Sequence, residues 1–179
     1  MPLTWSQDKF IKAFTFAAEA HGDQKLPGSE LPYMVHVGLV CMEIMALHEI
    51  EPMKNPDLAL QCAALHDVVE DKQVPLEIIR NKFGNEVADG VDALSKKKCS
   101  LFKLSAYLKK IKTRPKEISI VKLADRIINL QPPPCTWTKE KAIKYWEGSK
   151  IILYVLKEAS PYMAARLEKK ITEYEKFTS

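Results

Sequence analysis

The chain has 179 residues, of which 46% are hydrophobic and 28% are charged, and its formal net charge is +4. This length suits one compact domain over residues 1–179, and the composition excludes a disordered or collagen-like chain. A charge this mild does not predict a nucleic-acid partner, which usually meets a clustered basic stripe, but it is compatible with a small anionic ligand.

The first half of the chain is predicted to form long helices joined by a loop rich in turn residues. Ser6 or Thr4 is placed to cap the first helix, and Asn55 with Pro56 begins the third. Residues 22–34 contain two glycines and two prolines and are expected to form a loop. The third helix is apolar almost all round until its polar end, so it should be the central buried helix. Helices are expected at residues 5–21, 35–48 and 57–71.

The second half shows the same helical pattern, with clear breaks between the helices. Gly84 is a natural helix stop, Pro132, Pro133 and Pro134 break the chain, and Thr138 is placed to cap a long helix. The pattern shows no strand alternation, internal repeat or domain linker, so it predicts one all-α domain. Helices are expected at residues 75–83, 85–95, 101–112, 117–130, 138–159 and 161–177.

The termini and cysteines indicate the cellular compartment. The N-terminus lacks the basic and then apolar pattern of a signal peptide, and no apolar run approaches the about 18 residues that span a bilayer. No C-x-x-C pair is present, so a zinc ribbon or redox motif is not expected. We therefore predict a cytoplasmic protein with no membrane partner and with free, buried thiols at Cys41, Cys62, Cys99 and Cys135.

A dense group of polar residues ends the predicted central helix, in the sequence LHDVVED at 65–71. His66 and Glu70 are four residues apart, as are Asp67 and Asp71, so one imidazole and three carboxylates are expected to share one side of the helix. Burying such a set without partners would be costly, and like charges this close oppose joint ionisation. A bound divalent cation would relieve both problems.

Two further residues are candidates for the same cation. His36 lies on the preceding helix, and Asp125 lies in an apolar helix where an acidic residue needs a partner. Two imidazoles with two carboxylates suit manganese, iron or zinc better than calcium. The alternative is equally compatible with the spacing: a His–Asp pair is common, and Asp125 lies close enough to Lys122 and Arg126 for an ordinary salt bridge.

At this point the motifs resemble a known family. The order His36, His66-Asp67, Asp125 resembles the H…HD…D pattern of the HD-domain metal phosphohydrolases. More narrowly, the chain is similar to the hydrolase domain of RelA/SpoT-type proteins and to the stand-alone small alarmone hydrolases. The shared segments are AHGDQK (20–25), LPYMVH (31–36), AALHDVVED (63–71), FGNEVA (83–88) and KLADRIINL (122–130).

The resemblance implies an HD-type bundle of helices around one Mn²⁺ ion held by His36, His66, Asp67 and Asp125. It also implies removal of pyrophosphate from the 3′ position of guanosine tetra- or pentaphosphate. A metal-bound water would supply the nucleophile, and Glu70 or Asp71 would orient it or move its proton. Relatives range from monomers to higher assemblies, so the sequence leaves the oligomeric state open, including a homo-oligomer. Substrate contacts are expected at Lys25, Tyr33, Lys97, Asn129, Lys141 and Tyr145.

The sequence departs from the family pattern where the base and phosphates should bind. Alarmone hydrolases commonly carry consecutive basic residues in the first loop, where this chain keeps Lys25, and Gln131 with three prolines follows where an arginine is common. Adenosine analogues of the alarmones are therefore candidate substrates beside the guanosine forms. The alternatives are another HD-type 5′-nucleotidase or phosphodiesterase, a non-catalytic nucleotide sensor, and a helical protein–protein module. The several buried carboxylates disfavour the last of these. Two interpretations of His21 are open: it touches the site, since it lies in the segment AHGDQK, or, as the simpler account, it is a helix-end imidazole stabilised by the helix dipole.

Overall fold

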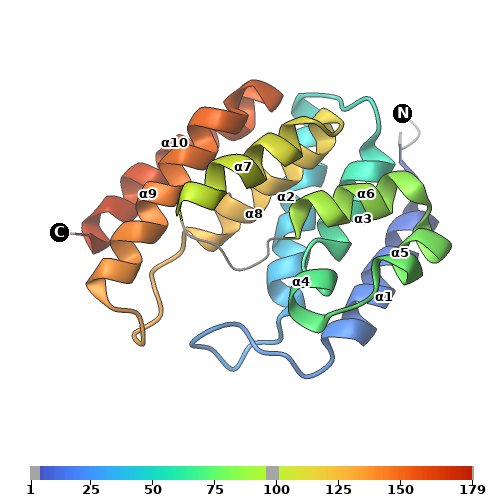
Figure 1. Ribbon diagram of the computed structural model, residues 1–179, viewed down its shortest axis with the longest axis horizontal. Coiled ribbons are helices and arrows are strands. Elements are labelled where there is room, and N and C mark those ends of the chain that lie inside the picture. The colour runs from blue at the N-terminus through green and yellow to red at the C-terminus, as the bar shows by residue number, and fades with distance from the viewer. Residues whose placement is uncertain (1–4, 96–100, 179) are drawn as a thin grey trace.

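The structure is a computed structural model that describes residues 5–95 and 101–178, and these ranges are helical with no strand (Figure 1). The predicted all-α fold is therefore confirmed. Among the described residues, no helix combines the length and the apolar character needed to cross a membrane. The helices are α1 (Gln7–His21), α2 (Met34–Ile50), α3 (Pro56–Leu65), α4 (Val68–Lys72), α5 (Leu76–Phe83), α6 (Asn85–Leu94), α7 (Leu101–Lys112), α8 (Lys116–Asn129), α9 (Lys139–Leu156) and α10 (Pro161–Tyr174), with short 3-10 turns at Lys157–Ala159 and Glu175–Phe177.

Side-chain caps fix where several helices begin. The Ser6 hydroxyl accepts the Lys9 amide at the start of α1, and the Asn55 side chain accepts the Leu58 amide before α3. Thr138 caps α9 in the same way. Each cap satisfies a backbone donor that has no partner within its own helix. The caps expected at Ser6, Asn55 and Thr138 are confirmed.

Helix α3 is the centre of the hydrophobic core, as predicted. Every residue of α3 except Asp57 is buried, and the helix packs against α1, α2, α6 and α8. The predicted continuation of this helix to residue 71 is wrong, because α3 ends at Leu65 and the short α4 begins at Val68. The His66 Nδ1 atom donates to the Ala63 carbonyl over 2.8 Å. In an unbroken helix that carbonyl would accept the amide of Asp67, so the imidazole replaces a backbone hydrogen bond at this turn.

The thiol prediction holds for two of the described cysteines. Cys41 and Cys62 are free and buried, and burial raises the pKa of the Cys41 thiol to about 12. Cys135 is exposed, so the prediction of burial is wrong there, because it lies in the connection that the prolines keep out of the helices. Cys99 lies outside the described residues.

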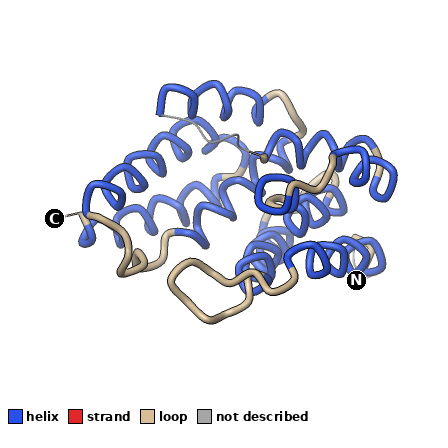
Figure 2. The backbone as a smooth tube through the Cα atoms, turned by 60° about the horizontal axis from the view of Figure 1, so that its bottom comes forward, coloured by secondary structure: helices blue, strands red, loops and turns tan. Residues whose placement is uncertain are grey.

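Two loops lie together on one side of the helical body. The loop between α1 and α2 and the connection between α8 and α9 both project at the bottom of Figure 1, and Figure 2 shows them on the same side. Gly28, with φ +72°, lies against the second loop, where an added Cβ would stand 2.9 Å from Pro134 Cβ. Glycine therefore permits both the backbone conformation and the close approach of the two loops.

Candidate metal centre and adjoining cleft

Four polar side chains meet where α2, the α3–α4 turn and α8 converge. His36 lies in the first turn of α2, His66 and Asp67 form the turn that separates α3 from α4, and Asp125 lies on α8. His36, His66 and Asp125 are buried. The turn after Leu65 thus places His66 and Asp67 beside His36 and Asp125, which come from two other helices.

The facing atoms of these side chains lie within a few ångströms of one another. His36 Nε2 is 3.2 Å from His66 Nε2 and 3.4 Å from Asp125 Oδ1. Asp67 Oδ2 is 2.8 Å from His66 Nε2 and 3.8 Å from His36 Nε2. The two imidazole nitrogens therefore lie close to a carboxylate oxygen of Asp67 and to one of Asp125, and the atoms of His36, His66 and Asp67 all lie within 4.8 Å of one another.

Neighbouring groups hold His66 and Asp67 in their orientations. The Ala63 carbonyl accepts a hydrogen bond from His66 Nδ1, which leaves Nε2 to face the cluster. The Tyr33 hydroxyl donates to Asp67 Oδ2 over 2.5 Å.

Asp125 is held from two sides. Lys122 Nζ donates to its Oδ2 over 2.7 Å, and Asn129 Nδ2 donates to its Oδ1 over 2.5 Å. The salt bridge considered as an alternative from the sequence is therefore present, but it uses the Asp125 oxygen that points away from the imidazoles.

The electrostatics of this cluster favour a positive charge at its centre. Burial lowers the pKa of the His66 imidazole, but the charge of Asp67 and its hydrogen bond raise that pKa to about 9. Burial also raises the pKa of Asp125, yet Lys122 and the two imidazoles hold it well below its usual range. A site whose carboxylates raise the pKa of a buried imidazole also suits a divalent cation, and His36, His66 and Asp67 can offer ligand atoms to one ion.

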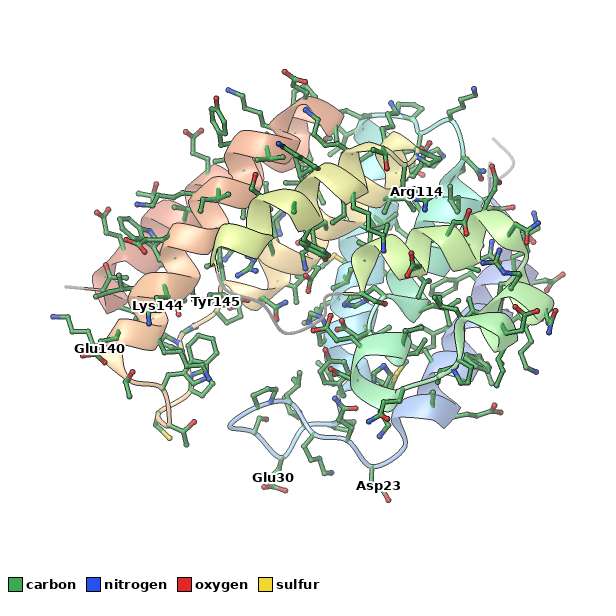
Figure 3. All side chains as sticks on the ribbon, in the orientation of Figure 1. Asp23, Glu30, Arg114, Glu140, Lys144 and Tyr145 are labelled. Atoms are coloured by element: carbon green, nitrogen blue, oxygen red, sulfur yellow. The ribbon has the colours of Figure 1, made fainter. Side chains whose placement is uncertain are left out.

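A cleft of about 370 Å³ opens beside the cluster, between the two projecting loops. His36 and Asn129 lie on the side toward the cluster, and Tyr145 of α9 lines the far wall. Figure 3 shows Tyr145 directed from α9 toward the middle of the molecule, whereas Glu140 points outward from the start of the same helix. The Arg126 guanidinium lies 4.1 Å from the centre of the Tyr145 ring. The remaining lining is mainly apolar and comes from Leu26, Pro27, Ser29, Leu31, Leu39, Ile128, Gln131, Pro132, Pro133, Pro134, Trp137 and Tyr174.

Comparison with known proteins identifies similar hydrolases. No protein-family profile matches the chain. A guanosine-3′,5′-bis(diphosphate) 3′-pyrophosphohydrolase of Drosophila melanogaster, MESH1, is 29% identical over 173 residues, which cover 92% of this chain and 94% of that protein. A longer enzyme of the same name from Aquifex aeolicus is 32% identical over 69% of this chain and 18% of its own length.

A solved structure shares the fold. It is described as a metazoan ortholog of SpoT that hydrolyses ppGpp, and it superposes with a TM-score of 0.81 over 96% of this chain and 98% of its own, at 24% identity. Over most of its length the chain is similar in sequence to these hydrolases, and it shares the fold of the SpoT ortholog. The identification expected from the sequence motifs is confirmed.

The residues predicted to contact substrate are placed in three ways. Asn129 and Tyr145 line the cleft, and Lys141 Nζ lies 4.2 Å from the ring centre of Trp137, which also lines it. Lys25 is exposed at the base of the projecting loop, where it pairs with Pro32 in an isolated bridge. Tyr33 points at Asp67. Lys97 lies outside the described residues.

The two residues predicted to be catalytic lie on α4, in its first turn. Glu70 and Asp71 are both exposed, one turn beyond Asp67. Asp71 Oδ2 accepts a hydrogen bond of 2.8 Å from Gln24 Nε2, which belongs to the loop after α1. The pair is therefore close to the metal candidates along the chain and open to solvent.

The sequence suggests two interpretations of His21, and the structure favours the one in which the residue lies beside the site. The residue is fully buried, and its ring lies against Tyr33 with the ring centres 4.7 Å apart. Its Nδ1 atom lies 3.0 Å from Gln24 Oε1. The signal was present in the segment AHGDQK, which puts a histidine at a helix end three residues before a glutamine.

Proposed function

We propose that the chain is an Mn²⁺-dependent 3′-pyrophosphohydrolase of guanosine or adenosine tetra- and pentaphosphates. Its products would be the nucleoside di- or triphosphate and pyrophosphate. The observation that carries this proposal is the convergence of His36, His66, Asp67 and Asp125 beside a cleft of nucleotide size. The names of its relatives support the substrate class. We also propose that residues 1–179 act as one domain in the cytoplasm.

The four converging side chains would hold a single ion. Two imidazoles and two carboxylates suit a borderline ion such as Mn²⁺. When bound, such an ion lowers the pKa of its water and offsets negative charge on a phosphoryl group. Tyr33 would keep Asp67 in place, while Lys122 and Asn129 would do so for Asp125.

Glu70 and Asp71 would supply the proton chemistry. Both carboxylates are exposed one helical turn from Asp67, so they can reach a water molecule beside the cluster. An ionised carboxylate accepts hydrogen bonds and is suited to orient that water and take its proton.

The cleft would bind the nucleoside, with the phosphates directed toward the metal candidates. Trp137 and Tyr145 offer aromatic faces, and Asn129 offers an amide near the metal candidates. Lys141, Lys25 and Lys97 are proposed to hold phosphate groups from outside, since an ammonium group binds phosphate as a compact point charge.

The lining of the cleft also supports a second candidate, another HD-type nucleotide phosphohydrolase. Among the described residues that line the cleft, there is no lysine, arginine, aspartate or glutamate. Gln131 occupies the rim where relatives often carry arginine. A wall of this kind selects by shape and stacking more than by charge, so simpler nucleotides would also fit.

Product analysis separates these functions. We expect purified protein with Mn²⁺ to release pyrophosphate from ppGpp or ppApp, and EDTA to stop the reaction. Inorganic phosphate or a monophosphate as product would favour the second candidate. Asp67→Ala should reduce the rate to the uncatalysed background, whereas Asp23→Ala in the exposed loop should not change it (Figure 3). Full activity in Asp67→Ala would overturn the proposed centre.

A further inference from the structure

Three residues form a line of hydrogen bonds from the end of α1 to α4. His21 ends α1, Gln24 follows in the loop, and Asp71 lies on α4. His21 Nδ1 and Gln24 Oε1 are 3.0 Å apart, and Gln24 Nε2 donates to Asp71 Oδ2 over 2.8 Å. We call this line, made of His21, Gln24 and Asp71, the Gln24 bridge.

Chemistry fixes the direction of each bond in the Gln24 bridge. An ionised carboxylate only accepts, so the amide NH₂ of Gln24 must face Asp71 and its carbonyl oxygen must face His21. That oxygen also only accepts, so His21 must carry its proton on Nδ1. His21 Nε2 is then a bare acceptor, which agrees with its being buried without a hydrogen-bond partner among the described residues. Burial also lowers the pKa of His21, which favours the neutral ring that this arrangement needs.

The surroundings leave the Gln24 bridge little freedom. The backbone of Gln24 is also held on both sides. Its N–H donates to the backbone carbonyl of His21 over 3.0 Å, and its backbone carbonyl accepts the backbone N–H of Tyr33 over 2.8 Å. Lys72 Nζ donates to the same His21 carbonyl, which ties α4 to the end of α1 a second time. The His21 ring is fully buried against Tyr33, so it can neither rotate into solvent nor leave Gln24.

We infer that His21 and Gln24 are positioning residues that set the orientation of the Asp71 carboxylate for the reaction. Asp71 is exposed and lies on a five-residue helix, so its own helix does little to restrict its side chain. The buried imidazole fixes the Gln24 amide, and the amide then fixes one Asp71 oxygen. The other oxygen stays free to take a proton. This inference rests on the proposed role of Asp71 in catalysis.

A kinetic double-mutant cycle tests the inference. Gln24→Leu keeps the side-chain size but removes both hydrogen bonds, and we expect kcat to fall by about 10–100-fold, as is typical for residues that orient others. KM and Mn²⁺ affinity should stay unchanged, because neither the cleft lining nor the metal candidates include Gln24. In an Asp71→Ala background, Gln24→Leu should change kcat by less than about twofold. Gln7→Leu, at the exposed start of α1, is the matched control. Equal losses in both backgrounds, or a loss of Mn²⁺ affinity, would overturn the inference.

A second measurement does not depend on activity. The chain has four histidines, so ¹⁵N NMR of the protein with a diamagnetic divalent ion can assign the His21 ring through His21→Gln. We expect the Nδ1–H tautomer in the native chain, because only that tautomer can donate to Gln24 Oε1 and so turn the Gln24 NH₂ group toward Asp71. An Nε2–H tautomer in the native chain would overturn the inference. A native chain that hydrolyses no nucleotide would instead overturn the proposed function, and the tautomer would still decide whether the Gln24 bridge acts on Asp71.

Discussion

At the scale of single residues, Tyr33 is the side chain that links the projecting loop to the proposed metal centre. Its hydroxyl donates to Asp67, and its ring lies between His21 and His36, with ring centres 4.7 and 5.3 Å away. Burial and the charge of Asp67 raise the pKa of Tyr33, so the hydroxyl remains a donor at neutral pH. Tyr33 can therefore keep one Asp67 oxygen fixed without carrying charge itself.

Removing this hydroxyl should weaken the centre without disturbing the fold. We expect Tyr33→Phe to lower Mn²⁺ affinity or kcat by about 10–100-fold, because Asp67 loses the group that orients it. Calorimetric titration with Mn²⁺ and steady-state kinetics measure the two effects. Tyr154→Phe serves as the control, since Tyr154 is 77% exposed. Native affinity together with native kcat in Tyr33→Phe would show that the hydroxyl has no such role.

At this scale the sequence predicts which residues form the proposed metal centre, but not which residues hold them in place. Spacing and motif order predict that His36, His66, Asp67 and Asp125 belong together, and the structure does bring their side chains together. The contacts of Tyr33 with Asp67, and of Gln24 with Asp71, join residues 34 and 47 positions apart in the chain. Such pairs depend on how the loop closes against α4, which no local pattern specifies.

At the scale of elements, α6 depends on a close approach at Gly90. A Cβ added there would stand 2.6 Å from Ile118 Cδ1 and 2.7 Å from Cys62 Sγ, so the α6 backbone lies directly against side chains of α8 and α3. Gly38, in contrast, lies inside α2 with nothing within 4 Å of an added Cβ. A substitution at Gly90 therefore tests helix packing, whereas a substitution at Gly38 tests helix propensity alone.

Matched substitutions at these glycines should change stability in opposite directions. Gly90→Ala should reduce the free energy of unfolding by about 1–3 kcal/mol, since the extra methyl group overpacks the helix contact. Gly38→Ala should raise it by about 0.5–1 kcal/mol, because alanine favours the helix and finds open space. Urea unfolding measures both as midpoint shifts at constant slope. Destabilisation of the same size in both variants would contradict this packing.

The helices themselves are largely predictable from apolar spacing, capping residues and breaks. The exception is the break between α3 and α4, which the continuous helical pattern of residues 57–71 conceals. It depends on one side chain, since His66 bonds the Ala63 carbonyl in place of a backbone amide. Competition of this kind between a side chain and the backbone has no signal in apolar periodicity.

At the scale of the whole molecule, the proposed centre joins distant parts of the chain. In Figure 1, α2 and α8 run through the middle, with α1, α3 and α5 on one side and α9 and α10 on the other. Glu43 of α2 is buried and paired with Arg166 of α10 through two guanidinium nitrogens, which fastens the C-terminal helix to the same α2 that carries His36. The four converging side chains can meet only when α8 has packed on α2 and the α3–α4 turn.

The family resemblance predicts the overall fold but not the shape of the cleft. The HD-type bundle follows from the ordered motifs, whereas the cleft wall comes from Trp137 and the three prolines of the α8–α9 connection. The sequence predicts a helix break at these prolines and a change in the expected nucleotide pocket there. Their position against Gly28 of the other loop is a tertiary contact, which no local pattern specifies.

Titration of metal-free protein with Mn²⁺ tests the central claim most directly. We predict one ion per chain, and a free energy of unfolding that rises by about 2.7 kcal/mol when free Mn²⁺ is one hundred times its Kd. His66→Gln and Asp125→Asn should each abolish tight binding, whereas Asp23→Asn in the exposed loop should leave it intact. Absence of tight Mn²⁺ binding in the native chain, or binding that survives both substitutions, would contradict the metal centre.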